Sequence, residues 1–202
     1  MHVCGKGFRE PIAFPARVSY IRMIFNRFFE ISNMKQHTEA EIHIVSYDES
    51  WQELFNTEKS LLSGVIGEFL TGPIEHVGST AVPGLAAKPV IDIMAGVKSL
   101  DASRPAISIL GKYEYCYYPY RLEIMHWFCK PSPQFRTHHL HLVPYNSKVW
   151  NERLAFRDYL RSHSDVVQEY AELKYRLAEQ YRFDREKYTE AKTTFIKNIL
   201  NI

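Results

Sequence analysis

The segment that most constrains this chain is residues 75–97, EHVGSTAVPGLAAKPVIDIMAGV. It begins with a polar cluster, turns through Gly and Pro, and ends in an apolar run that contains one acid, Asp92. A charge inside an apolar run is costly to bury unless it is paired or binds a metal. The small residues Gly78, Ser79 and Thr80 let backbone N–H groups approach an anion closely. A phosphate-binding turn followed by an acid-bearing strand is typical of folds that transfer nucleotides.

Length and composition indicate one globular domain with an appendage. The chain has 202 residues, of which 46% are hydrophobic and 24% charged, an ordinary globular composition. Residues 1–40 differ because they are rich in Arg and poor in acids. We interpret them as an N-terminal extension that is disordered, an amphipathic surface helix, a non-native addition or a transit peptide. The fold is therefore assigned to residues 41–202.

Charge and cysteine content exclude several classes of protein. The formal net charge of +2 gives no sign of the large excess of positive charge that nucleic-acid-binding proteins carry, so we expect a small-molecule partner. The three cysteines have no CxxC spacing, which argues against a disulfide framework and a structural zinc site. A reducing cytoplasmic location fits best. No apolar stretch is long enough to span a membrane, and the oligomeric state is left open.

The order of predicted elements indicates an α+β fold, with a mixed sheet covered by helices and a helical C-terminal segment. Helical spacing of apolar residues from Trp51 to Phe69 follows Asp48, a candidate N-cap, and Gly72-Pro73 should end that helix. A further helix is expected at 101–110, with Gly111 as its C-cap. Strands are predicted at 42–46, 90–97, 122–130 and 137–143, and three helices after Pro144, the last capped by Asp184 and striped through Ile199.

Two strands carry the candidate catalytic residues. Alternation places Asp92 on one face with Met94, while Ile91 and Ile93 face the other side. In THHLHLV at 137–143, His139 and His141 share one face. Two imidazoles at i, i+2 can ligate one metal ion, or one can act as acid or base while the other orients a phosphate. Alternatively, Asp92 is a buried acceptor for loop amides and the histidines are structural.

Candidate phosphate contacts come from the turn and from scattered basic residues. The Ser79 hydroxyl and the neighbouring amides can bind a phosphate, although a tight turn capped by Ser79 would have the same sequence. Further candidates are the basic residues Lys88, Arg121, Arg136, Arg157, Lys174 and Lys192, although most lysines are simply solvated. The predicted phosphate-binding set is Gly78, Ser79, Thr80, Lys88, Arg157, Lys174 and Lys192.

The segment EHVGSTAVPGLAAKPVIDI at 75–93 resembles the signature of the GrpB family. The resemblance runs from about residue 44 to the C-terminus and includes HHLHLV at 138–143, FRDYLRSH at 156–163 and YAELK at 170–174. It implies a fold similar to that of the polymerase-β nucleotidyltransferase superfamily, with Gly-Ser at the head of a short helix and a strand bearing Asp-x-Asp/Glu. Gly78, Ser79 and Asp92 match this pattern, whereas Met94 occupies the position of the second acid.

Three functions are compatible with these residues. The first is transfer of a nucleotidyl or phosphoryl group to a small acceptor, with a nucleoside triphosphate as substrate, Mg²⁺ or another divalent metal as cofactor, and Asp92, His139 and His141 as catalytic residues. The second is a non-catalytic domain that binds a nucleotide or coenzyme, which the missing second acid favours. The third is a phosphoesterase whose metal is held by the same Asp and two His. Whether the protein is an enzyme therefore stays open at this point.

Overall fold

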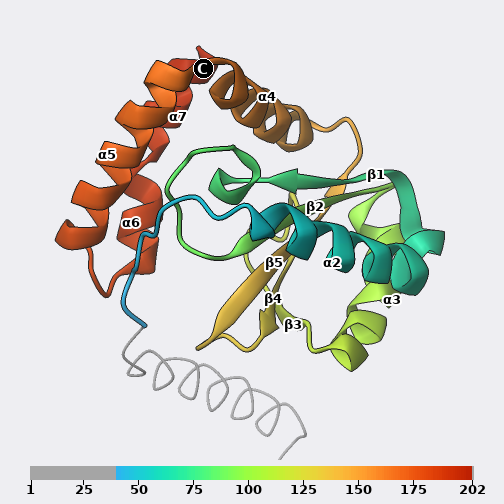
Figure 1. The fold of residues 1–202 in the computed structure, drawn as a ribbon. Coiled ribbons are helices and arrows are strands. Elements are labelled where there is room, and N and C mark those ends of the chain that lie inside the picture. The colour runs from blue at the N-terminus through green and yellow to red at the C-terminus, as the bar shows by residue number, and fades with distance from the viewer. Residues whose placement is uncertain (1–39, 202) are drawn as a thin grey trace, which may run out of the picture. The chain divides into compact units, whose positions relative to one another are not determined.

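The computed structural model describes residues 40–201. The interpretations of the N-terminal extension concern residues that, apart from Ala40, lie outside this range. Within the described residues the chain forms an α+β domain in which helices pack on a mixed sheet, as predicted (Figure 1). No helix in residues 40–201 combines the length and the apolar character that crossing a membrane requires.

A mixed sheet forms the centre of the described domain. Its five strands in residues 40–201 have the order β1-β2-β5-β4-β3. The parallel pair is β2 with β5, and the other neighbours are antiparallel. The strands are β1 (Leu70–Val77), β2 (Ile91–Val97), β3 (Cys116–Tyr118), β4 (His126–Pro131) and β5 (Arg136–Pro144). Parallel neighbours need a crossover connection, so a helix and two strands separate β2 from β5 in sequence.

Two helices bury one face of the sheet. They are α2 (Ser50–Ile66) and α3 (Leu100–Leu110). Trp51, Phe55 and Leu62 lie on one side of α2, as the helical repeat requires, and pack on Ile91 and Ile93 of β2. Burying such side chains contributes roughly 1.5–3 kcal/mol each, so this face supplies the main core.

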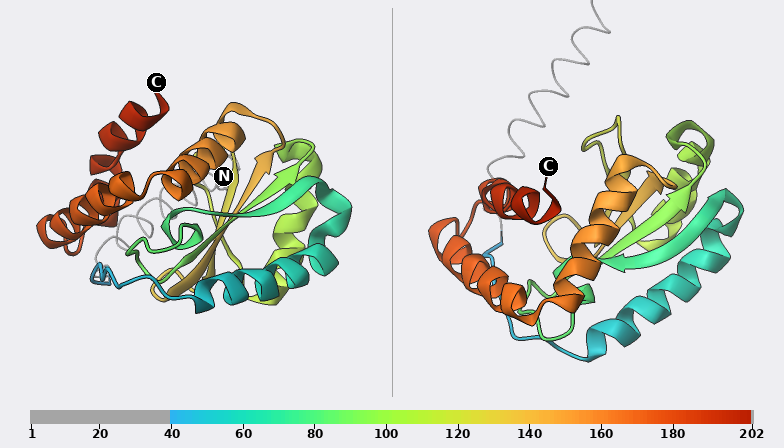
Figure 2. Two further views of the ribbon diagram at one scale, coloured as in Figure 1. Left: turned by 45° about the horizontal axis from the view of Figure 1, so that its top comes forward. Right: turned by 90° about the horizontal axis from the view of Figure 1, so that it is seen from above.

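Four helices follow β5 in the described domain, and the first of them packs on the second face of the sheet. They are α4 (Lys148–Ser162), α5 (Ser164–Gln180), α6 (Arg185–Ala191) and α7 (Thr193–Leu200). Trp150 of α4 packs with Met94 and Val143 on the face opposite α2, and Figure 2 shows the sheet between α2 and α4. Met94 is fully buried in this apolar cluster. The residue at the second acid position therefore contributes to packing.

The helix starts follow local hydrogen-bonding rules. Ser99, Ser147 and Asp184 each accept a hydrogen bond from a backbone N–H of the first turn of α3, α4 and α6. The prediction of Asp48 as the N-cap of α2 is wrong, because the N-cap is Glu49; Asp48, one residue earlier, accepts from the backbone N–H of Ser50 at 2.8 Å. Gly111 is the C-cap of α3, as predicted.

Two predictions near the N-terminal end of the domain are wrong. The expected strand at 42–46 is reduced to one bridge between Val45 and Ala87. Gly72-Pro73 does not end a helix but lies inside β1. Pro73 is tolerated there because β1 is an edge strand. Gly72 is required because a Cβ would lie 2.2 Å from the Tyr145 ring.

Two further boundaries differ from the sequence prediction. The strand expected at 122–130 begins only at His126, since the N–H groups of Ile124 and Met125 donate to the Arg121 carbonyl and form a turn. The last helix, predicted to be continuous, is divided into α6 and α7 at Lys192. Apolar spacing continues across the break, which is why the pattern alone did not reveal it.

Candidate functional site

A cavity of about 570 Å³ opens beside β2 and β5, a volume within the usual range for small-molecule sites. Seven basic and three acidic side chains line it, and several aromatic rings join them. The cavity therefore carries an excess of positive charge in a protein that is nearly neutral overall. The basic lining residues are Lys88, Arg121, Arg136, Arg153, Lys174, Arg185 and Lys192.

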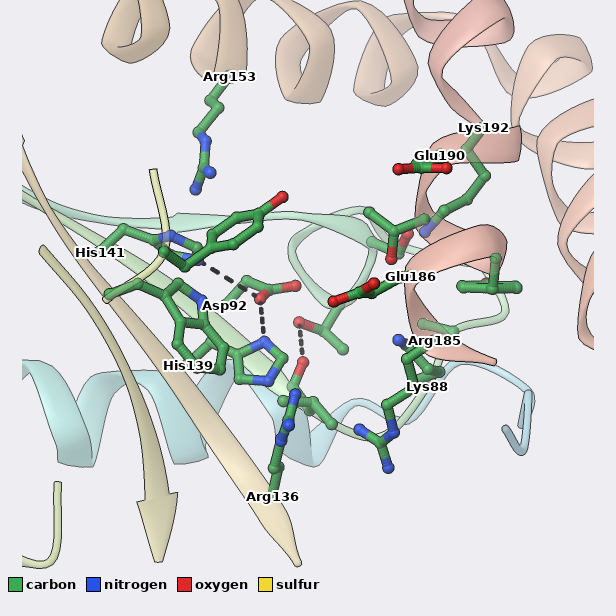
Figure 3. Close-up of a pocket in the computed structure, with 18 of the residues that line it drawn as sticks. Lys88, Asp92, Arg136, His139, His141, Arg153, Arg185, Glu186, Glu190 and Lys192 are labelled. Carbon is green, nitrogen blue, oxygen red and sulfur yellow. Dashed lines mark hydrogen bonds and ion pairs between the residues drawn. The ribbon is translucent and has the colours of Figure 1, made fainter. Parts of the chain in front are cut away.

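Asp92 lies at the centre of this cavity (Figure 3). The parallel register of β2 and β5 places Asp92 opposite His139 and Met94 opposite His141. The Nδ1 atom of His139 lies 2.9 Å from Oδ1 of Asp92, and Nε2 of His141 lies 3.9 Å from the same oxygen. The three predicted catalytic residues thus occupy one site, although β2 and β5 are far apart in sequence.

The carboxylate of Asp92 stays ionised. Burial acts to raise the pKa of Asp92, but the hydrogen bond with His139 and the nearby His141 imidazole outweigh it and hold that pKa well below its ordinary value. Burial lowers the pKa of His141 to about 3, with repulsion from Arg153 as a further cause. Near neutral pH the site therefore combines an anionic Asp92 with a neutral His141 imidazole.

The turn before β2 lies beside this carboxylate. Ser79 and Thr80 form the short 3₁₀ helix Ser79–Ala81 and line the cavity. The Thr80 hydroxyl donates to the Val90 carbonyl at 3.3 Å and lies 3.0 Å from Nε2 of His76. These bonds fix the turn to the start of β2, so Ser79, Thr80 and Asp92 keep constant relative positions.

Gly78 is adapted to its neighbour Asp92. Its φ of 71° is unfavourable for other residues, and a Cβ would lie 2.4 Å from Oδ2 of Asp92. We expect Gly78→Ala to lower the free energy of unfolding by about 1–3 kcal/mol through backbone strain. The added methyl group should also displace the carboxylate of Asp92. Urea denaturation measures the first effect, and the NMR titration of His139 measures the second. Gly84→Ala is the matched control, since its φ is 77° but its Cβ would meet open space. Equal losses and unchanged histidine titrations would contradict a specific contact with Asp92.

Three lysines approach the cavity near two tyrosine rings. The Nζ atoms of Lys88 and Lys192 lie 4.9 and 4.1 Å from the centre of the Tyr188 ring, and Nζ of Lys174 lies 4.8 Å from that of Tyr170. Lys174 also donates to the Ala86 carbonyl. Burial lowers the pKa of both Lys174 and Lys192 to about 7, and like charge nearby adds to the effect. An anion bound here would restore their protonation.

Arg157 is the predicted phosphate ligand that the cavity does not include. Its Nη1 atom donates hydrogen bonds to the Glu75 carboxylate at 2.7 Å and to the His76 carbonyl at 3.0 Å. Its Nε atom donates to the Asp158 carboxylate at 2.8 Å. The guanidinium therefore joins α4 to β1 and is not available to a ligand. Gly78 is likewise absent from the cavity lining and acts through the space it leaves for Asp92.

A family model described as GrpB protein matches residues 41–201. The chain belongs to the GrpB family. The glutamate-rich protein GrpB of Alkalihalophilus pseudofirmus is 40% identical over 168 residues, which cover 80% of this chain and 95% of that protein. The crystal structure of GrpB from Enterococcus faecalis superposes with a TM-score of 0.71 at 32% identity, covering 79% of this chain and 95% of that one.

A more distant solved structure shares the fold alone. It is the GLD-2/RNP-8 complex, with a TM-score of 0.50 at 14% identity, covering 73% of this chain and 58% of that one. The GrpB family match begins at residue 41, where the sequence analysis placed the start of the domain. All of the matched residues belong to the described domain, and every residue that lines the cavity lies within the matched range.

Sequence reasoning missed several residues that line the site of this GrpB-family chain. The most informative is Arg153, which lies one turn before Arg157 on α4. Neither arginine has an acid three or four residues away in sequence, so helix spacing gives no signal to separate them. Trp127 and Tyr188 were also missed, since they come from separate elements, whereas Arg121 and Arg136, two candidate phosphate contacts, do line the cavity.

The side chains around Asp92 do not form a metal site with three protein ligands. Within residues 40–201, no group of three His, Cys, Asp or Glu side chains is arranged to hold a metal ion. Oδ1 of Asp92 is occupied by His139, and Nε2 of His139 is buried without a hydrogen-bond partner. Oδ2 of Asp92, however, has no hydrogen bond to another residue of the described domain. One carboxylate oxygen suits Mg²⁺ that arrives with nucleotide phosphates, but not the transition-metal site of a phosphoesterase.

Proposed function

We propose that the cavity binds a nucleoside triphosphate and that the protein transfers its nucleotidyl group to a small acceptor. The observation that carries this proposal is an ionised Asp92 set among seven basic side chains in one cavity. Basic side chains bind phosphates, and the aromatic residues Trp127 and Tyr118 offer apolar surface to a base. Glu186 and Glu190 of α6 supply acceptors for sugar or base groups.

The arrangement suits an in-line displacement at the α-phosphorus. An acceptor hydroxyl placed next to Oδ2 of Asp92 gives its proton to the carboxylate as the acceptor oxygen forms a bond to the phosphorus. The bond between the α-phosphorus and the bridging oxygen breaks, and pyrophosphate leaves with the electron pair. Because the pKa of Asp92 is low, the proton then passes to water.

The basic residues would compensate the charge of the triphosphate. Lys88 and Lys192 lie on one side of Asp92 in Figure 3, and Ser79 and Thr80 line the same cavity. We assign this side, with Lys174, to the β- and γ-phosphates. Charge that develops on the leaving pyrophosphate would be stabilised by groups already in place. Mg²⁺ that arrives with the nucleotide would be held by the phosphates beside the negative charge of Asp92 and would supply further neutralisation.

Nucleotide binding is expected to be coupled to proton uptake. At pH 8, Lys174 and Lys192 are mostly neutral because their pKa values are about 7. Bound phosphates raise both values, so ATP or pyrophosphate should take up about one to two protons per site. Isothermal titration calorimetry in two buffers of different ionisation enthalpy, with and without Mg²⁺, measures this number.

A matched pair of variants checks the assignment. Lys192→Gln should reduce the uptake by about one proton, whereas Lys148→Gln should not change it, since Lys148 is exposed and does not line the cavity. ATP binding without any proton uptake would contradict the role given to the lysines. Absence of binding by ATP, GTP, CTP, UTP and pyrophosphate alike would contradict the proposed function itself.

A second candidate is a nucleotide-binding domain without chemistry. The observation that favours it is Met94, since the second acid position is occupied by a fully buried apolar side chain. Incubation with α-³²P-labelled triphosphates, cell extract and Mg²⁺ or Mn²⁺ separates the two. Labelled product favours transfer, whereas stabilisation of the protein by a nucleotide without any turnover favours this second function.

A further inference from the structure

Arg153 lines the cavity without an anionic partner among residues 40–201. Its guanidinium has one hydrogen-bond acceptor within residues 40–201, the sulfur of Met125 at 3.9 Å, which is a weak acceptor. No Asp or Glu in the same range lies within ion-pair distance of it. Arg157, one turn further along α4, is by contrast fully paired. A partly buried guanidinium without a partner is costly unless a ligand supplies the anion.

The position of Arg153 relative to Asp92 is specific. Figure 3 shows Arg153 extending from α4 into the cavity on the His141 side of Asp92, whereas Lys88 and Lys192 approach from the other side. The sulfur of Met125 also lies 3.3 Å from Nδ1 of His141, so Met125 contacts both the imidazole and the guanidinium. Arg153 and the pair Lys88 and Lys192 therefore approach the carboxylate from different sides, while Arg185 lies beside Lys88 and Arg136 lies near His139.

Arg121 adds a second guanidinium near Arg153. It lines the same cavity and is close enough to repel Arg153 electrostatically. Its backbone has a φ of 50°, and its carbonyl accepts hydrogen bonds from the N–H groups of Ile124 and Met125. The turn that carries Arg121 is thus linked directly to Met125, so both guanidinium groups are placed by one short segment and α4.

We propose that Arg153 and Arg121 form a second anion subsite that binds the acceptor by a carboxylate or phosphate group. This inference rests on the proposed function, because it assigns the lysine side of the cavity to the nucleotide. The acceptor is then a small molecule with an anionic group at one end and a hydroxyl that reaches Oδ2 of Asp92. Guanidinium groups bind both kinds of anion through paired N–H donors.

The geometry also explains why two anions can occupy one cavity. The carboxylate of Asp92 lies between Arg153 on one side and Lys88 and Lys192 on the other, and separates the acceptor anion from the triphosphate. The cavity volume of about 570 Å³ leaves room for a nucleotide and a small acceptor in contact. The His141 imidazole is neutral near pH 7, so it adds no charge to either subsite. The two subsites therefore differ in their ligating side chains, with Arg121 and Arg153 in one and Lys88, Lys174 and Lys192 in the other.

Calorimetric titrations of the full chain with 3-phosphoglycerate, lactate and glycerol 3-phosphate test this subsite. The first compound carries both anions and a hydroxyl, and the other two carry one anion each, so the comparison shows whether carboxylate or phosphate is recognised. Arg153→Gln is expected to weaken binding of the preferred compound by about tenfold or more and to change the affinity for ATP less than about twofold. Lys192→Gln should show the reverse pattern, and Lys148→Gln should change neither affinity.

Thermal unfolding shows whether Arg153 has a structural role instead. Because Arg153 has no acidic partner in the described domain, Arg153→Gln should unfold at the same temperature as the wild type or at a higher one. Equal loss of ATP and acceptor-anion affinity in Arg153→Gln would overturn the subsite and assign Arg153 to the nucleotide. Binding of ATP without binding of any of the three anions would also overturn it. Binding of an anion that depends on Arg153, without any binding of ATP, would leave the subsite standing and overturn the proposed function.

Discussion

Asp92→Asn is expected to reduce nucleotidyl transfer by about 10²–10⁴-fold, the usual contribution of a positioned acid or base. The amide keeps the shape of the side chain but cannot accept a proton from the acceptor hydroxyl. It also removes a negative charge from the centre of the cavity, where phosphates bind. The affinity for ATP should therefore be unchanged or higher while turnover is lost, and this combination separates a catalytic role from a binding role. Product formation from labelled triphosphate and calorimetric titration with ATP measure the two effects.

Asp101→Asn serves as the control for this substitution. Asp101 is an exposed carboxylate on α3 whose partner is Arg104, and it does not line the cavity. This variant should retain wild-type turnover and affinity. The proposed role of Asp92 is wrong if Asp92→Asn and wild type give equal labelling, or if the substitution weakens ATP binding as strongly as it lowers turnover. Circular dichroism and thermal unfolding establish that Asp92→Asn is folded before either comparison is made.

Glu58→Leu is expected to destabilise the domain by about 3–5 kcal/mol, the range for breaking a buried ion pair by removing one partner. Glu58 is 6% exposed and joins α2 to the sheet. Its Oε1 atom accepts hydrogen bonds from Nζ of Lys130 at 2.9 Å and from the Tyr115 hydroxyl at 2.8 Å. Removing the carboxylate leaves a cation and a hydroxyl without their acceptor. The midpoint of thermal unfolding should fall by roughly 6–20 °C for a domain of this size.

Two further variants identify the cause of that loss. Glu58→Leu combined with Lys130→Met should recover most of the stability, because a well-packed apolar pair often replaces a buried ion pair at little cost. Glu53→Ala, an exposed position on the same helix, should change the free energy of unfolding by no more than about 0.5 kcal/mol. If Glu58→Leu is as mild as Glu53→Ala, or if the double variant is no more stable than the single one, the ion pair does not hold α2 to the sheet as described.

The candidate site was only partly predictable because some of its residues follow a local sequence pattern, whereas others are placed by contacts between segments far apart in sequence. His139 and His141 were recognised because alternation along one strand is local. Arg153 and Arg157 could not be separated, since both lie on the same helix with similar neighbours in sequence. Glu75 of β1, which precedes Arg157 by 82 residues, forms an ion pair with Arg157. This pairing keeps the Arg157 guanidinium out of the cavity. No local pattern records a pairing over that distance.

The errors in the fold have a related origin. Gly72-Pro73 indicates a helix end by local rules, yet an edge strand also tolerates Pro because it need not donate a hydrogen bond on its open side. The Tyr145 ring packs over Gly72, and the sequence before β1 gives no sign of that contact. Similarly, α6 and α7 share one apolar stripe, and Lys192, the residue at the break between them, lines the cavity.

The sequence by itself determined the α+β class, the GrpB-family membership and the faces of β2 and β5 on which Asp92, His139 and His141 lie. These follow from side-chain periodicity and from ordered motifs, which are properties of neighbouring residues. Only the tertiary structure decided that β2 and β5 pair in parallel with Asp92 opposite His139. It also decided which basic side chains of α4 to α7 reach the cavity. Strand pairing and helix docking depend on burial across the whole domain, so no single segment of the sequence specifies them.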